Sequence, residues 1–228
     1  MIIEHKLIGI FVNKALIMHA YIAKQPILNS ARQIVAYELL YRDSLENTFP
    51  TINAENATER LVNEHLLSSN INELVNNKPY FINFTEKSIL KGLPKKLINK
   101  PIVVEVLEDV PPTKMILHAL TTLKSMGFTI ALDDFIYSED WLPFFSIVDI
   151  IKFDITLTSF KEIKALQPLL AQHEISILIE KIETESQFKQ ARNLQSTYFQ
   201  GYLFSEPEIV LNEINRPDAK IINMTSAT

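Results

Sequence analysis

Short apolar runs alternate with amphipathic helical patterns along most of the chain. Runs such as "YFINF" and "IVVEV" predict buried strands, because a strand covered on both faces needs few polar positions. Between such runs, Ile116, Leu120 and Leu123 recur at the spacing of one helix face. Strands are expected at 79–84, 101–108, 129–134, 148–154, 175–180 and 197–202, and helices at 57–67, from about 112, at 160–173 and at 186–194.

The first apolar runs predict a hairpin, in which residues 20–27 and 33–42 flank a polar turn at 29–32. The strands and helices that follow indicate a parallel sheet covered on its outside. About seven or eight such units in 228 residues fit a doubly wound sheet or a compact α/β barrel of the TIM (β/α)8 type. The positions of the polar residues favour the barrel.

Polar side chains stand at the ends of the predicted strands. In parallel strands these ends meet at one edge of the sheet, where barrel enzymes carry their active sites. In the hairpin strand, a side-chain period of two places Glu38 and Arg42 on one face. The strand-end residues are Asn83, Glu105, Asp133, Asp134, Lys152, Glu180 and Gln200.

Taken singly, these residues have ordinary explanations. Asp134 could cap a helix, Lys152 could pair with a nearby carboxylate, Gln200 could be a core amide and Asn83 a turn former. Together, four or more carboxylates at one end of a barrel would repel strongly unless cations were bound among them.

The ligand chemistry favours Mg²⁺ or Mn²⁺, which prefer oxygen, over zinc, which prefers His and Cys. The five histidines form no ligand-spaced pair, and there is no cysteine. A lysine among metal-bound carboxylates can orient or deprotonate a water. The residues therefore predict a divalent-metal enzyme acting on an anionic substrate, and leave open an enolase-like proton-abstraction site or a binding shell without turnover.

Charge and composition exclude other classes. Lys+Arg 22 against Asp+Glu 27 gives a net charge of -5, which argues against binding of DNA or RNA polymers or anionic membranes. Four glycines leave no Gly-rich phosphate loop. The apolar segment at 7–23 is interrupted by Asn13, Lys14 and His19, so we expect neither a membrane span nor a signal peptide. The lack of cysteine fits a reducing compartment, and we expect a cytoplasmic protein.

Seven short motifs follow one another along the chain: "ELLYR", "INF", "EVLE", "DDF", "IKFD", "EKIET" and "QGYLFSEP". On these motifs the chain resembles, over residues 21–207, the EAL family of cyclic-di-GMP phosphodiesterases. Their order and spacing make the set specific, although each motif is weak alone. Several of them look like the subgroup in which an EAL domain precedes a helical HDOD domain. We expect an EAL domain at 21–210, an N-terminal extension at 1–20, and a tail at 211–228 with no HDOD domain.

The resemblance implies a modified TIM (β/α)8 barrel whose first strand runs antiparallel to the others. It also implies a two-metal site for Mg²⁺ or Mn²⁺ and assigns a role to each matching residue. The implied metal ligands are Glu38, Asn83, Glu105, Asp133 and Asp134; the catalytic residues are Lys152, Glu180 and Asp134. The implied substrate-binding residues are Arg42, Gln200, Pro207 and Leu40; Glu108 and Glu183 would support the loop that follows the paired aspartates.

The activity implied by the resemblance is opening of cyclic di-GMP to linear pGpG, with inhibition by Ca²⁺ because its coordination is larger and looser. Family members often form homodimers, and a protein signalling partner is a further expectation. Two positions depart from the family pattern. The loop "DDFIYSEDW" lacks the family's glycines, so Ile136, Tyr137 and Ser138 would adopt a positive φ less cheaply, and Lys181 replaces a glycine at the substrate rim. The alternative function is an inactive EAL module that binds cyclic di-GMP or a protein partner.

Overall fold

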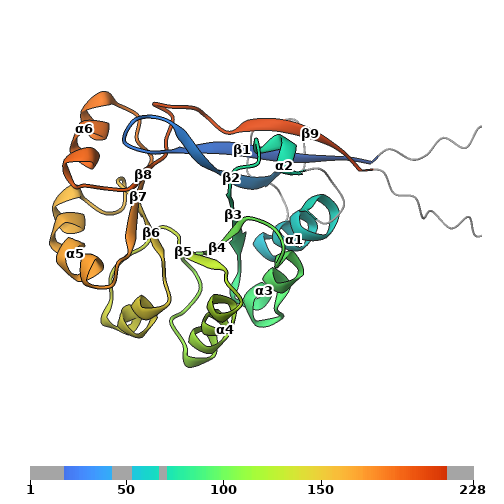
Figure 1. Cartoon of the computed structure of the whole chain (residues 1–228), viewed down its shortest axis with the longest axis horizontal. Helices are drawn as coiled ribbons and strands as arrows, with labels where there is room; N and C mark the ends of the chain where they lie inside the picture. Colours follow the sequence, from blue (N-terminus) through green and yellow to red (C-terminus); the bar gives the residue numbers. More distant parts are fainter. Residues whose placement is uncertain (1–17, 43–52, 67–70, 215–228) are drawn as a thin grey trace, which may run out of the picture.

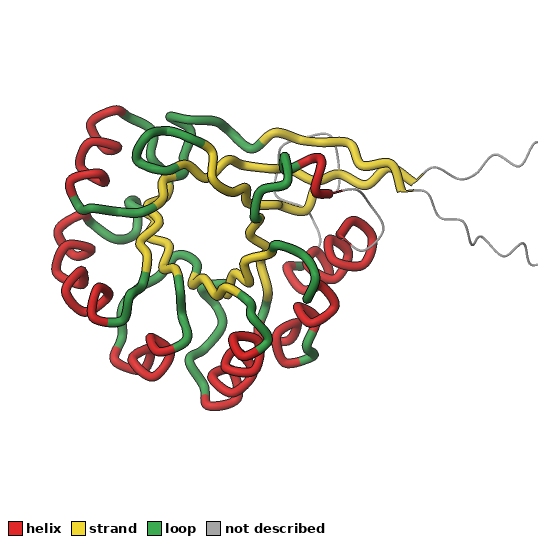
Figure 2. Tube along the Cα trace, viewed as in Figure 1, coloured by secondary structure: helices red, strands yellow, loops and turns green. Residues whose placement is uncertain are grey.

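The computed structural model describes residues 18–42, 53–66 and 71–214. Its centre is a ring of strands surrounded by helices (Figures 1 and 2). The strands are β1 (Met18–Leu28), β2 (Ile34–Arg42), β3 (Tyr80–Phe84), β4 (Ile102–Val106), β5 (Thr129–Leu132), β6 (Ile150–Asp154), β7 (Ser176–Glu180), β8 (Tyr198–Phe199) and β9 (Glu208–Ile214).

The barrel is closed by one reversed strand. Strands β2 to β8 pair in parallel and in chain order, while β1 pairs antiparallel with β2 on one side and with β8 on the other. The β1–β2 hairpin and the modified (β/α)8 barrel predicted from the sequence are therefore confirmed. Strand β9 was not predicted; it pairs antiparallel with β1 from Met18↔Ile214 to Lys24↔Glu208, across the expected domain boundary at 210. The expectations for residues 1–17 and 215–228 lie outside the described residues.

Helical segments cover the outside of the ring and bury its outer face. They are α1 (Ala54–Arg60), η1 (Leu61–Leu66), α2 (Ile71–Leu74), α3 (Glu86–Leu90), η2 (Leu93–Leu97), α4 (Lys114–Ser125), η3 (Glu139–Ser146), α5 (Phe160–Gln172) and α6 (Glu185–Asn193). Ile116, Leu120 and Leu123 of α4 are buried, as the spacing predicted. None of the helices in the described ranges combines the length and the apolar character that crossing a bilayer requires.

Polar side chains cap the N-terminal ends of several of these helices. The Thr113 hydroxyl accepts a hydrogen bond from the backbone of α4, and Ser159 and Thr184 form capping boxes at α5 and α6 with Glu162 and Gln187. These caps set where each helix starts after its strand, and so fix the lengths of the loops at the barrel mouth.

The interior of the barrel contains a small apolar layer. In β4, Val103 belongs to this layer, whereas Val104 belongs to the larger core between sheet and helices. Because side chains alternate along a strand, the residue two positions after each layer member of the parallel strands also faces inward, nearer the carboxyl end. The layer is made of Ile27, Ala36, Phe81, Val103, Ala131, Ile150 and Leu178.

Candidate active site at the barrel mouth

The polar residues of the site stand two positions beyond the apolar layer. Moving two residues on from each layer member in the parallel strands gives Glu38, Asn83, Glu105, Asp133, Lys152 and Glu180. In the reversed strand β1 the direction is opposite, so the residue two positions before Ile27, Gln25, reaches the same level. The structure thus brings together the strand-end residues predicted from the sequence, and adds Gln25. The sequence could have indicated Gln25 only through the reversed direction of its strand, which brings a residue before Ile27 to the barrel mouth.

Lys152 lies at the centre of this group and is buried, with 1% of its side chain exposed. Its Nζ lies 2.7 Å from Asp133 Oδ1, contacts Glu105 Oε1, and lies 3.1 Å from Glu180 Oε1 and 3.8 Å from Glu38 Oε2. One ammonium group therefore faces four carboxylates. The excess of negative charge in a buried site favours the binding of further cations.

Two amides join this group where the barrel closes. Gln200 Nε2 donates to Glu38 Oε2 at 2.8 Å and to Gln25 Oε1 at 3.0 Å, and Asn83 Nδ2 donates to Glu38 Oε1 at 3.4 Å. Glu38 is therefore held through both of its oxygens. These contacts place the first, second, third and last strands of the ring in fixed relation to one another.

Burial changes the acidity of the carboxyl groups. It raises the pKa of Glu180 to about 8 and that of Glu105 well above its usual range, against the attraction of Lys152. Burial, followed by repulsion from Asp133, raises the pKa of Asp134 to about 6. For Asp133 burial also acts upward, but the charge and hydrogen bond of Lys152 bring its pKa below the usual value. Burial acts to lower the pKa of Lys152, but the surrounding carboxylates raise that pKa well above its usual value.

Four oxygens in this group are buried and accept no hydrogen bond from the described residues. They are Asn83 Oδ1, Glu105 Oε2, Glu180 Oε1 and Gln200 Oε1. Of these, Glu180 Oε1 lies 3.1 Å from Lys152 Nζ as an ion pair. Buried acceptors without donors are costly, and oxygen ligands of this kind suit a hard divalent cation. The residues present therefore fit the metal ions implied by the sequence.

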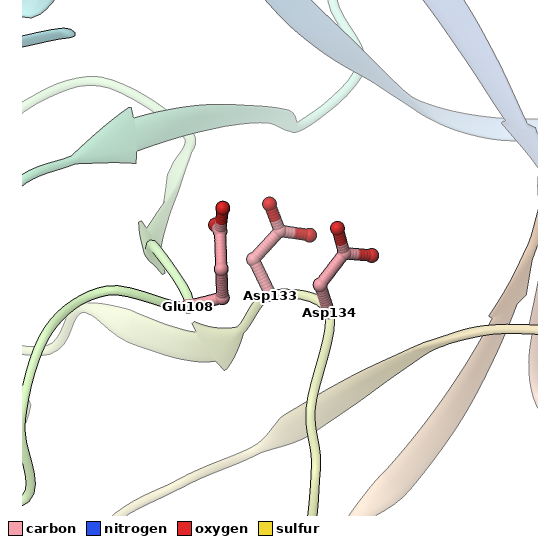
Figure 3. A group of neighbouring side chains, drawn as sticks. All are labelled: Glu108, Asp133 and Asp134. Carbon is pink, nitrogen blue, oxygen red and sulfur yellow. The ribbon is translucent and has the colours of Figure 1, made fainter. Parts of the chain in front are cut away.

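A second acidic group lies nearer the surface. One carboxylate oxygen each of Glu108, Asp133 and Asp134 lies within 4.8 Å of the others, and Figure 3 shows the three side chains side by side and pointing the same way. The resemblance assigns Glu108 to support of the following loop. The structure places its carboxylate beside the two aspartates, where it could also contribute to a metal site.

The loop after Asp134 does not use the backbone conformation that its missing glycines would provide. None of Ile136, Tyr137 and Ser138 has a positive φ, whereas Asp134 has φ 41° and Lys181 has φ 56°. Phe135 anchors the loop: it is buried, and its ring centroid lies 5.9 Å from those of Trp141 and Phe153. The prediction that residues 136–138 would need a costly positive φ is therefore wrong. The chain turns at Asp134 instead, and aspartate tolerates the left-handed region.

The polar group opens into a cavity of about 390 Å³. Arg42, Leu40 and Pro207, predicted to bind substrate, line it together with Lys181 and Tyr202. Glu105 has 0% exposure, does not line the cavity and contacts Lys152, and Glu183 is exposed and does not line the cavity. A larger hollow of about 570 Å³ between α3 and α4 is lined by aliphatic residues, three lysines and His118 but no carboxylate.

Comparison with known proteins gives a consistent result. The family model described as "EAL domain" matches residues 18–207. The chain is 42% identical over 201 residues to cyclic di-GMP phosphodiesterase CdgJ of Vibrio cholerae, covering 87% of this chain and 46% of CdgJ. It is 39% identical over 198 residues to the uncharacterised protein YuxH of Bacillus subtilis, covering 85% of this chain and 48% of YuxH. The chain thus spans about half the length of these curated relatives.

A solved structure supports the fold. Klebsiella pneumoniae BlrP1, in a complex with manganese and cyclic di-GMP, superposes with a TM-score of 0.66 at 21% identity, over 86% of this chain and 59% of BlrP1. BlrP1 has also been solved with calcium and cyclic di-GMP. At this identity the likeness concerns the fold alone.

Proposed function

Because the chain belongs to the EAL domain family, we propose that it is a metal-dependent phosphodiesterase that hydrolyses cyclic di-GMP to linear pGpG. The observation that carries the proposal is the convergence of five carboxylates, an asparagine and the buried Lys152 on one cavity at the barrel mouth. The name of CdgJ, and the cyclic di-GMP complexes of BlrP1, support the choice of substrate.

Two Mg²⁺ or Mn²⁺ ions would be held by Glu38, Asn83, Glu105, Asp133 and Asp134, as the resemblance assigns. Glu108 is a further candidate because of its place beside the aspartates. When bound, such ions lower the pKa of a coordinated water and neutralise charge on phosphoryl oxygens. The manganese complex of BlrP1 supports this choice, and Ca²⁺ is expected to inhibit because it accepts larger and looser coordination.

The chain's own residues orient the substrate and the attacking water. Lys152 Nζ carries its proton among the carboxylates and would donate a hydrogen bond to that water. Glu180, with its raised pKa, would exchange a proton with the water or the leaving oxygen. In the reaction the water oxygen bonds to phosphorus, one P–O ester bond breaks, and the leaving oxygen takes a proton. Arg42, Gln200, Leu40 and Pro207 would hold the dinucleotide.

The glycine-free loop gives no reason to prefer an inactive module. The expected strain at Ile136 to Ser138 motivated that alternative, and those residues have ordinary φ values. A homodimer and a protein signalling partner stay predictions from the resemblance, and a cytoplasmic location stays a prediction from the lack of cysteine.

Incubation of the purified protein with cyclic di-GMP and Mn²⁺ tests the proposal. We expect pGpG to form with Mn²⁺ or Mg²⁺, and neither without metal nor with Ca²⁺ alone. Tight binding of cyclic di-GMP by calorimetry with no product at high protein concentration would establish the inactive binding module instead. Absence of both binding and turnover would leave a protein partner as the function of this fold.

A further inference from the structure

Lys181 stands out among the cations of the cavity. It lines the cavity, is exposed, and makes no hydrogen bond or ion pair with any described residue. Lys152, by contrast, is surrounded by four carboxylates. The charge of Lys181 is therefore available to a ligand, whereas the charge of Lys152 is balanced by the carboxylates around it.

The backbone holds Lys181 in place on both sides. Glu180 ends strand β7, and after Lys181 the Ile182 N–H donates to Gln200 O at 3.1 Å while Ile182 O accepts from Leu203 N at 2.9 Å. These bonds join the segment to the turn after β8. Lys181 itself has φ 56°, in the left-handed region, which residues other than Gly, Asn and Asp adopt at an energetic cost. A strained residue persists where its surroundings fix it, and such residues concentrate at functional sites.

The position of Lys181 separates its role from that of the buried group. The carboxylates and Lys152 lie at the base of the cavity, where the bond that is cut would lie. A cyclic dinucleotide carries two phosphates, so one is left over when the other is at the base. Lys181 is on the exposed rim beside Glu180, within the same cavity.

We propose that Lys181 binds the phosphate of the cyclic dinucleotide that is not being hydrolysed. This proposal rests on the proposed function for its substrate. The ammonium group would form a charge-assisted hydrogen bond with a non-bridging oxygen of that phosphate. Because the phosphate does not react, the contact has the same strength in the ground state and the transition state, and it would lower KM without changing kcat.

Three variants test the proposal. Lys181→Gln removes the charge and should raise KM about tenfold with kcat changed less than about twofold, the size expected for loss of one hydrogen bond to a charged group. Lys181→Arg keeps the charge and should stay within about threefold of the wild type in KM. Lys164→Gln, at an exposed position of α5, changes the net charge equally and should leave KM unchanged. The KM of the wild type should also rise more steeply with salt than that of Lys181→Gln.

The outcomes separate this proposal from the proposed function. Equal KM values for wild type and Lys181→Gln, or equal losses in Lys181→Gln and Lys164→Gln, would overturn the role of Lys181 while leaving the activity in place. If the wild type makes no pGpG, the proposed activity fails, and calorimetric Kd values for cyclic di-GMP decide the role of Lys181 by the same comparison. Lys181→Gly serves as a check on the backbone: it should match Lys181→Gln in KM, and a wild-type KM in Lys181→Gly would contradict the proposal. If the wild type neither binds nor cleaves cyclic di-GMP, both proposals fall.

Discussion

Gln200 Nε2 donates a hydrogen bond to Glu38 Oε2 at 2.8 Å, and this bond joins the strand that begins the parallel series to the residue that follows its last strand. The two residues are 162 positions apart in the chain. Glu38 also accepts from Asn83. The point of barrel closure is therefore part of the candidate site, because the pairing that closes the ring also brings Gln200 and Glu38 into contact.

Glu38→Gln should separate the charge of this residue from its position. The amide oxygen can still accept a hydrogen bond from Gln200 or Asn83, but the site loses one negative charge. We expect Mn²⁺ affinity to fall by at least about tenfold and pGpG formation by about a hundredfold or more. Calorimetry with Mn²⁺ and a product assay measure the two effects. Wild-type activity in this variant, with an unchanged melting temperature, would mean that the metal site lies elsewhere.

Lys152→Met should reveal how strongly the buried carboxylates depend on one cation. Removing one partner of a buried ionic group leaves the others uncompensated, and we expect the free energy of unfolding without metal to fall by about 3 kcal/mol. Saturating Mn²⁺ should restore more stability to the variant than it adds to the wild type, because it replaces the missing charge. Urea unfolding with and without Mn²⁺ measures both.

The matched control for that variant is Lys124→Gln, which breaks a surface pair with Asp149 whose side chains are 37% and 32% exposed. Its cost should be about 1 kcal/mol or less, with no dependence on Mn²⁺. Equal losses in the two variants would contradict the interpretation of Lys152 as the central charge of the site.

Much of the site could be predicted from the sequence because parallel strands share a direction. Once "IVVEV" and "IALDD" are recognised as neighbouring strands, Glu105 and Asp133 must lie at one end. Gln25 escaped this reasoning because its strand runs the other way, so its polar residue precedes its apolar neighbour Ile27. The predicted hairpin already implied this reversed direction, but the pairing of β1 with β8 that closes the ring is a contact between distant segments, which a local pattern does not contain.

The backbone angles of the loops could not be predicted either. The departure from the family pattern pointed to strain at Ile136 to Ser138, where the family has glycines, but the structure has positive φ at Asp134 and Lys181. In this loop Phe135, next to the turn at Asp134, packs against Trp141 and Phe153. Such packing depends on three segments at once. Strand β9 was missed for a similar reason, since its pairing with β1 is a long-range contact.

Asp134 combines a carboxylate at the metal site with φ 41°, and two variants separate these features. Asp134→Asn keeps a side chain that tolerates the left-handed region, so we expect the free energy of unfolding to stay within about 0.5 kcal/mol while Mn²⁺ affinity falls. Asp134→Ala should lose the same affinity and about 1 kcal/mol of stability in addition. Denaturant unfolding and Mn²⁺ calorimetry distinguish the two. Equal stability of both variants would show that the backbone angle is not under strain.

Gly201, which follows Gln200, allows a close approach to the backbone of Ile182, which follows Lys181. A Cβ at this position would lie 2.2 Å from Ile182 O, and φ is 149°. Gly201→Ala should therefore destabilise the fold by about 3 kcal/mol or more and lower activity, because the backbone of Ile182 must shift. Gly127→Ala is the control: its φ is 91° but nothing lies within 4 Å of the added Cβ, so the cost should be about 1 to 2 kcal/mol with activity unchanged. Similar losses at both positions would mean that the angle, and not the contact with Ile182, decides.

The loop after Asp134 gives the most direct test of whether missing glycines limit activity. Ile136 is 66% exposed and has no positive φ. Ile136→Gly therefore makes positive φ values accessible that the loop does not adopt in the structure. We expect kcat/KM to stay within about twofold of the wild type, with a loss of stability of about 0.5 to 1 kcal/mol from the greater entropy of the unfolded chain. Trp141→Ala, which removes the edge contacts to Phe135 and Phe144, should instead lower both stability and Mn²⁺ affinity, because Phe135, the residue next to Asp134, loses a packing partner. A large gain of activity in Ile136→Gly would show that the glycine-free loop restrains turnover and that its packing in the structure is not the active arrangement.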